Sequence, residues 1–136
     1  MSTATTLYTG DLRTEIRHNQ SGTIIITDAP TDNQGRGEAF SPTDLLAVSL
    51  GSCMLTIIGI AAREHGFDID GTRLGITKIM ASDPRRVSEV VIDFHLPHQN
   101  YTAKQKRIIV AATRTCPVAL SLHPGLIQTI NLNFDE

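Results

Sequence analysis

A helix signal at residues 41–66 constrains this chain more than any other feature of its sequence. Residues 41–44 read Ser-Pro-Thr-Asp, which is typical of a helix start with Ser as N-cap, Pro in the first turn and an acid at the third helical position. Gly66 can end the helix in the left-handed conformation, so that it runs to about His65. Between these ends, residues 45–62 are apolar on nearly every side. Such a helix is expected at the centre of a fold, with every face buried.

The same apolar stretch is close to the roughly 18 residues at which a membrane span becomes a candidate. It carries Ser49, Ser52 and Thr56, however, and no second apolar stretch accompanies it. The first residues also lack the basic and apolar regions of a secretory signal peptide. We therefore expect a cytoplasmic protein with no membrane partner. A dimer is one way for so small a chain to bury every face of the helix, and Gly51 and Gly59 would allow a second helix or sheet to approach closely.

Alternating and β-branched stretches predict strands on both sides of this helix. The predicted strands span residues 7–18, 23–28, 72–81, 87–96 and 126–134. A second helix is predicted over residues 102–122, where Pro117 removes a backbone donor and kinks or restarts the helix. The order is ββ-α-ββ-α-β, and at 136 residues the chain suits one α+β domain that spans residues 1–136.

The charge and composition exclude several classes of partner and cofactor. A net charge of −2 gives no sign of binding to a nucleic-acid backbone, and two Tyr, four Phe and no Trp offer no stacking platform for bases. The five histidines lack the spacing of a metal site. The sequence also holds no Gly-rich phosphate loop and no nucleophile elbow. We expect no nucleic acid, no metal and no bound cofactor.

The candidates for chemistry are two cysteines, Cys53 in the first helix and Cys116 at the break in the second. Each also suits core packing, because free cysteine often acts as a small buried hydrophobe. An apolar site raises the pKa of a thiol, whereas a nucleophile needs the thiolate, so a reactive Cys53 requires a nearby cation. The candidate cations all lie before the helix: Arg13, Arg17 and Arg36. With 63 positions between the cysteines, the residues alone do not show that the two thiols meet.

Two acids near the start of the first helix are further candidates. Asp44 suits helix capping better than catalysis, although both roles stay open. Glu38 lies in a loop that also contains Gly35 and Gly37, and it is expected to be solvated there. Asp44 is therefore kept as a catalytic candidate beside its capping role, whereas Glu38 is not.

Three short motifs resemble the OsmC/Ohr family. Residues 41–46, Ser-Pro-Thr-Asp-Leu-Leu, and residues 50–53, Leu-Gly-Ser-Cys, resemble the helix that holds its first cysteine. Residues 115–118, Thr-Cys-Pro-Val, resemble its second-cysteine motif, and residues 8–11, Tyr-Thr-Gly-Asp, resemble its opening strand. The element order and the cysteine separation are similar over nearly the whole chain. The resemblance implies an α+β fold with antiparallel sheets, a long buried central helix and an intertwined homodimer.

The resemblance also implies thiol-dependent reduction of organic hydroperoxides, as part of an oxidative stress response. Cys53 would be the peroxidatic cysteine, whose thiolate attacks the peroxide and becomes a sulfenic acid. Cys116 would be the resolving cysteine, which condenses with it to a disulfide. An external dithiol, such as a dihydrolipoyl group, would then restore both thiols. Arg13, with Arg17 as the alternative, would stabilise the Cys53 thiolate.

The chain departs from the family at one position that concerns this chemistry. The family places a Glu ten positions before the first cysteine, to bridge to the arginine; Thr43 stands there, and the acid is Asp44, one position later. One residue turns a helical side chain by about 100°, so Asp44 could replace that Glu only from another direction. The departure indicates a divergent branch and keeps a second function open, which is redox sensing or small-ligand binding without turnover. The third alternative is that both thiols have a purely structural role.

Overall fold

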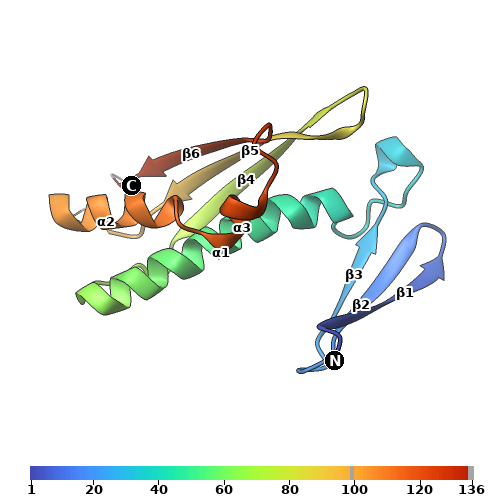
Figure 1. The fold of residues 1–136 in the computed structure, drawn as a ribbon, viewed down its shortest axis with the longest axis horizontal. Helices are drawn as coiled ribbons and strands as arrows, with labels where there is room; N and C mark the ends of the chain where they lie inside the picture. The colour runs from blue at the N-terminus through green and yellow to red at the C-terminus, as the bar shows by residue number, and fades with distance from the viewer. Residues whose placement is uncertain (99, 135–136) are drawn as a thin grey trace. The chain divides into compact units, whose positions relative to one another are not determined.

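The fold is described by a computed structural model, which covers residues 1–98 and 100–134. Two compact units follow one another along the chain, Met1–Leu46 and Ala47–Glu136 (Figure 1). Each unit contains a three-stranded sheet. The boundary between the units falls within the first turns of the long helix α1 (Pro42–His65).

The first unit is built on an antiparallel sheet of three strands, β1 (Ala4–Gly10), β2 (Arg13–His18) and β3 (Ile24–Asp28), in the order β1-β2-β3. The prediction of one strand over residues 7–18 is wrong, because the chain reverses at Asp11 and Leu12. These residues have φ of 55° and 62°, and the tightest hairpin turns require positive φ at both central residues. A loop with a short 3-10 helix, η1 (Thr31–Asn33), follows β3.

Helix α1 has the bounds that its sequence predicts. Ser41 and Asp44 cap it reciprocally: the Asp44 N–H donates to Ser41 Oγ at 3.0 Å, and the Ser41 N–H donates to the Asp44 carboxylate at 3.0 Å. At the other end, Gly66 has a φ of +72°, as expected for a left-handed helix end. Within the described part of the chain, α1 is the one helix long and apolar enough to cross a membrane, a test that the core helix of a soluble protein also passes.

The second unit has a mixed sheet of β4 (Arg73–Ala81), β5 (Arg86–His95) and β6 (Ile127–Asn133), in that order. Strands β4 and β5 pair antiparallel, as predicted, whereas β5 and β6 pair parallel. The expectation of purely antiparallel sheets is corrected by this last pair. Parallel neighbours need a crossover connection, which contains α2 (Ala103–Thr113) and α3 (Pro117–Ser121). Pro117 restarts the helix, as its position predicts.

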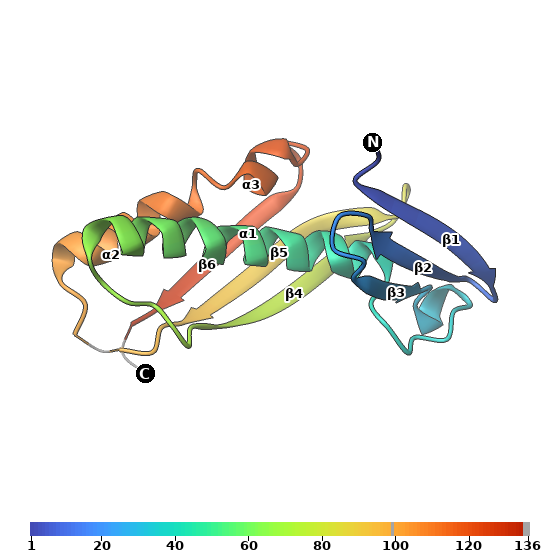
Figure 2. The same cartoon turned by 90° about the horizontal axis from the view of Figure 1, so that it is seen from below.

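The core of the second unit lies between its sheet and α1, which runs across β4, β5 and β6 (Figure 2). Every second residue of the central strand β5 points toward the helix, as strand geometry requires. The side chains of this core that have no exposed surface include Val90, Ile92, Phe94, Leu50 and Ile58. The buried face of α1 therefore matches the apolar face of the sheet.

Helix α1 is buried on one face only, so the expectation that every face is buried is wrong for the single chain. Gly51 lies on the buried face, where a Cβ atom would come within 2.7 Å of Ile76 Cδ1 of β4. The absence of a side chain thus allows the helix to approach the sheet closely. One sheet can cover only one side of a helix, and the opposite side of α1 is exposed at Ser49, Ser52, Thr56 and Ile60.

Candidate functional site

The structure brings together the two cysteines, which both belong to the second unit. Cys53 is half-buried on α1, and Cys116 is wholly buried at the start of α3. Both are free thiols. Cys53 packs against the core cluster that contains Cys116, and its interaction with Cys116 raises the pKa of Cys116. Residues that lie 63 positions apart in the sequence are therefore neighbours in the second unit.

The Cys116 thiol holds its proton more firmly than an ordinary thiol. Burial raises the pKa of Cys116, and the interaction with Cys53 raises it further. An interaction raises the pKa of a thiol when it stabilises the protonated form. Cys116 is therefore protonated at neutral pH.

The break between α2 and α3 holds Cys116 in place. Pro117 is the first residue of α3, and the residue before a proline is driven toward extended backbone. Cys116 accordingly has φ −65° and ψ 127°, and serves as the N-cap of α3. Its Sγ accepts a hydrogen bond from the Ala119 N–H at 3.4 Å. The same proline that ends the preceding helix thus orients the second thiol.

Arg13, the arginine predicted to serve the site, is held by two acids of its own unit. Its guanidinium donates to both oxygens of the Asp28 carboxylate, at 2.7 and 2.9 Å, and to Glu38 at 3.4 Å. Asp28 has no exposed surface. The hydrogen bond from Arg13 lowers the pKa of Asp28, and the same bond raises the pKa of Arg13. The role of Arg13 at Cys53 stays a prediction.

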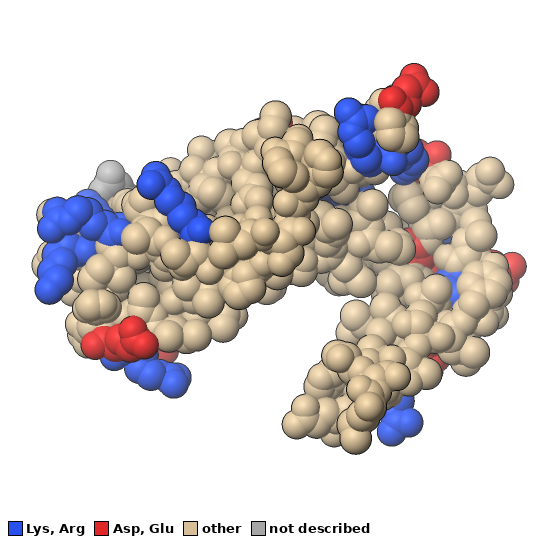
Figure 3. All heavy atoms as spheres, viewed as in Figure 1, with Lys and Arg blue, Asp and Glu red and all other residues tan. Residues whose placement is uncertain are grey.

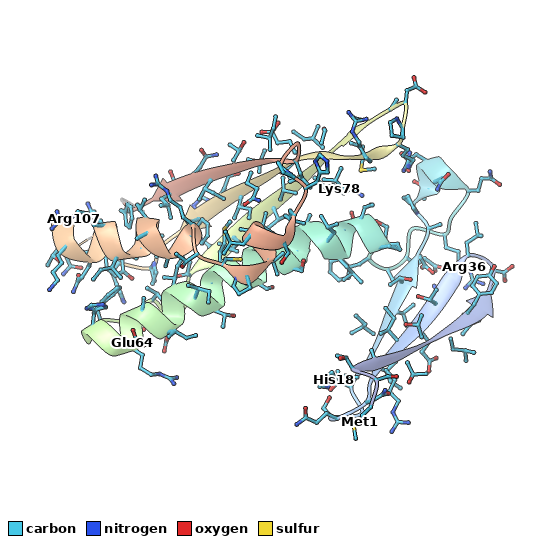
Figure 4. All side chains as sticks on the ribbon, viewed as in Figure 1. Met1, His18, Arg36, Glu64, Lys78 and Arg107 are labelled. Carbon is cyan, nitrogen blue, oxygen red and sulfur yellow. The ribbon has the colours of Figure 1, made fainter. Side chains whose placement is uncertain are left out.

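The remaining predicted residues have other contacts. Asp44 caps α1 through Ser41, which agrees with the capping role that its sequence favours. Arg36, labelled in Figure 4, donates to Asp11 at 2.8 Å. Among the described residues Arg17 takes part in no ion pair. Glu38 is exposed as predicted, but it also contributes to the cluster around Arg13.

Asp28 is the residue that sequence reasoning missed. It stands opposite Arg13 in the antiparallel register of β2 and β3, so the two side chains lie on the same face. The signal was present in the sequence as an acid directly after the β-branched run of residues 23–27. This signal could have been used only if the hairpin register were known, because a slip of one residue moves a side chain to the other face.

This arrangement is suited to two-electron thiol chemistry. One thiol is half-exposed, so that a reagent can reach it, and a second, buried thiol lies near it in the same core. Over residues 1–98 and 100–134, no group of three or more His, Cys, Asp or Glu side chains is arranged to hold a metal ion.

Comparison with known proteins assigns the chain to a family. The family model described as "OsmC-like protein" matches residues 35–131. This chain belongs to the OsmC-like family. A solved structure from Psychrobacter arcticus 273-4, described as that of a candidate osmotic stress induced and detoxification response protein, is 56% identical to it. That structure has a TM-score of 0.94, with 98% of this chain and 96% of the other covered.

More distant structures share the OsmC-like fold. An organic hydroperoxide resistance protein OsmC of Legionella pneumophila is 14% identical, with a TM-score of 0.76 and 98% of both chains covered. A hydroperoxide resistance protein candidate of Vibrio cholerae, solved with captopril bound in one of its active sites, is 15% identical, with a TM-score of 0.74 over 98% of this chain and 92% of that one. No curated protein matches the chain in sequence.

The position at which this OsmC-like chain departs from the resemblance has a local role. Thr43 stands where the family motif has its Glu, and its hydroxyl lies 3.2 Å from Ser41 Oγ within the helix cap. The acids that pair with Arg13 are instead Asp28 and Glu38. The carboxylate partner of the arginine is thus supplied by β3 and the following loop, not by α1.

Proposed function

We propose that this protein is a thiol-dependent peroxidase that reduces organic hydroperoxides through a Cys53–Cys116 disulfide cycle. The observation that carries the proposal is that the two free thiols, one half-exposed and one buried, lie near each other in the second unit. This supports a joint role for two motif cysteines that were only core candidates when taken one by one. Stress-related descriptions of OsmC-like relatives, including the 56% identical one, support a role in a detoxification or stress response.

The proposed reaction begins at Cys53, the more accessible sulfur. Its thiolate attacks one peroxide oxygen, the O–O bond breaks, and the alkoxide leaves as an alcohol after taking a proton. Cys53 is then a sulfenic acid. Cys116 gives up its thiol proton and attacks the Cys53 sulfur, which releases water and forms the disulfide. An external dithiol such as a dihydrolipoyl group restores both thiols by exchange and is itself oxidised to a disulfide.

The arginine that serves Cys53 is proposed to be Arg13. Asp28 and Glu38 hold its guanidinium in a fixed position, and a fixed charge loses little freedom when it pairs with a thiolate. Arg17 stays the alternative. Asp44 is proposed to act on the site through the start of α1, which it caps.

A homodimer is part of the proposal. Each unit of the single chain leaves apolar surface without cover, more than scattered surface residues would explain. On the first unit the exposed side chains include Leu7 (61%), Tyr8 (62%), Ile24 (52%) and Phe40 (56%). On the second, α1 exposes the face that carries Ile60 (50%). A second copy of the chain would cover both surfaces in the cytoplasm, where we expect the protein to work.

The test of the cycle is oxidation of reduced protein with cumene hydroperoxide, followed by mass spectrometry. Wild type is expected to lose two hydrogens and to show a Cys53–Cys116 peptide pair. Cys116→Ser should stop at a sulfenic acid on Cys53, whereas Cys53→Ser should consume no peroxide. Intact thiols in wild type, or direct passage to a sulfinic acid, would contradict the proposal.

A second candidate function is redox sensing or small-ligand binding without turnover. Thr43 in the helix cap, in place of the family Glu, favours it. An assay coupled to dihydrolipoamide separates the two functions. A peroxidase consumes many equivalents of peroxide for each protein, whereas a sensor is oxidised once and stops.

A further inference from the structure

A cavity of about 530 Å³ opens in the second unit between α1, α2, α3 and β6. Its volume falls within the roughly 300–1,000 Å³ that is usual for small-molecule sites. Its apolar lining comes from Met54, Val110, Leu120, Ile130 and Leu132, and its polar lining from Thr113, Arg114 and Gln128. An apolar chain can therefore contact one part of the wall while a polar head contacts the other.

The floor of this cavity is an incompletely covered part of the sheet. On the central strand β5, the helix-facing side chains of Val90, Ile92 and Phe94 have no exposed surface. Gln128, Ile130 and Leu132 continue this face on the edge strand β6, opposite those three residues in the parallel register, and they are only half-buried. The helix-facing side chains of the edge strand are thus left partly uncovered by the short helix α3.

The polar part of the cavity carries one sign of charge. Arg114, the C-cap residue of α2, is the charged residue of the lining, and within the described residues its guanidinium has no hydrogen-bond or ion-pair partner. Gln128 also faces the cavity, and its amide N–H donates to the Ala119 carbonyl at 3.0 Å. An aliphatic wall beside an unpaired guanidinium suits a ligand with an apolar chain and an anionic head.

The two acids of β5 lie on the other face of the sheet. Glu89 accepts a hydrogen bond from Thr129 at 2.6 Å, and Asp93 accepts one from Asn131 at 2.8 Å. Residues 129 and 131 alternate with the cavity residues of β6, so these pairs point away from the cavity. Helix α2 itself has three basic residues and no acid (Figure 3). Electrostatics on this side of the second unit therefore favours an anion.

We propose that this cavity is a binding site for a single-chain amphiphile with a carboxylate head, which pairs with Arg114 while its chain lies along Ile130 and Leu132. The proposed site rests on the second candidate function, small-ligand binding, and it does not depend on the chemistry of the thiols. It is therefore tested in the Cys53→Ser/Cys116→Ser protein, in which a peroxidase cycle is impossible.

The test uses decanoate as the probe and the methyl groups of the three methionines as reporters. Met54 lines the cavity and is 1% exposed, whereas Met80 lies on β4 outside it. In protein labelled with ¹³C at the methionine methyls, decanoate should shift the Met54 signal saturably and leave Met80 in place. Affinity should rise about fourfold for each methylene from hexanoate to decanoate, as burial of apolar chain predicts.

The charged head is tested with matched variants. Arg114→Ala should weaken decanoate about tenfold or more while leaving decanol unchanged, because a charge-assisted pair is lost and the apolar wall is kept. Arg107→Ala, on the exposed surface of the same helix outside the cavity, should behave as the parent. Equal affinity of the parent for decanoate and decanol overturns the proposal. The absence of a saturable Met54 shift also overturns it, and this is the result expected if a second copy of the chain fills the cavity.

Discussion

Asp28 has no exposed surface and nevertheless carries a charge, which Arg13 makes possible by binding both of its oxygens. A buried carboxylate without such a partner would be costly, so the pair behaves as one unit of the first sheet. Since Arg13 is also the proposed cation of the site, the ionisation of Asp28 concerns both stability and function.

The first prediction is that the Asp28–Arg13 pair makes stability fall in acid. The pKa of Asp28 is lowered in the folded protein, so its contribution is complete above the ordinary Asp pKa of about 3.9 and is lost as the pH falls through the folded value. Free energies of unfolding between pH 2 and 7 should show this loss in wild type. Asp28→Asn should be less stable at neutral pH and less sensitive to acid, whereas Asp83→Asn, in an exposed turn, should follow wild type.

The second prediction concerns the unequal thiols. Cys116 has no exposed surface and a raised pKa, while Cys53 is partly accessible. Because alkylation needs both access and a thiolate, iodoacetamide should modify Cys53 of reduced native protein at least about tenfold faster than Cys116. Peptide mass spectrometry over time measures both rates. Equal rates in the native protein would show that the buried sulfur is not protected, and unfolding in urea should abolish the difference.

Among the elements, α1 has the bounds that the sequence predicts, because its start and end are both local signals. Strands β3, β4, β5 and β6 lie within one residue of their predicted bounds. The split of residues 7–18 into β1 and β2 was missed, since Asp11-Leu12 is not a typical turn pair even though both residues have positive φ. The parallel pairing of β5 with β6 also could not be predicted from the sequence. It depends on the whole crossover, not on any pattern within either strand.

The third prediction tests how α1 packs on its sheet. Gly51→Leu should destabilise the protein by about 1–3 kcal/mol, because a side chain at this position would overlap Ile76. Ile76→Ala opens space at the same place. The double variant should therefore lose less stability than the sum of the two single variants, as measured by urea unfolding. Additive losses would mean that Ile76 is not what limits the approach of the helix.

For the whole molecule, the fold class and the candidate cysteines could be predicted from short motifs, whereas the geometry of the site could not. Helical position alone left both Cys53 and Cys116 as plausible core residues. Their contact depends on where Pro117 breaks one helix and how the next begins, which is a property of the folded second unit. The partner of Arg13 likewise depended on a strand register that no single residue reveals.

The fourth prediction concerns the assembly. If the apolar sheet of the first unit is covered by a second copy, the protein should sediment at twice the mass of the chain. Ile24→Lys places a charge on a side chain that is 52% exposed in the single chain, and it should weaken association about tenfold or more. Gln20→Lys, in the polar turn of the same sheet, is the matched control. A monomer in wild type at micromolar concentration would rule out the proposed dimer.

The complete burial of Cys116 imposes an order on events at the sulfur pair. A reagent that arrives from solvent, whether it takes electrons or supplies them, meets Cys53 and not its neighbour. In the proposed cycle, Cys116 changes its oxidation state only through Cys53. The packing that raises the pKa of Cys116 should then also protect it from over-oxidation, and permanent damage should accumulate on Cys53.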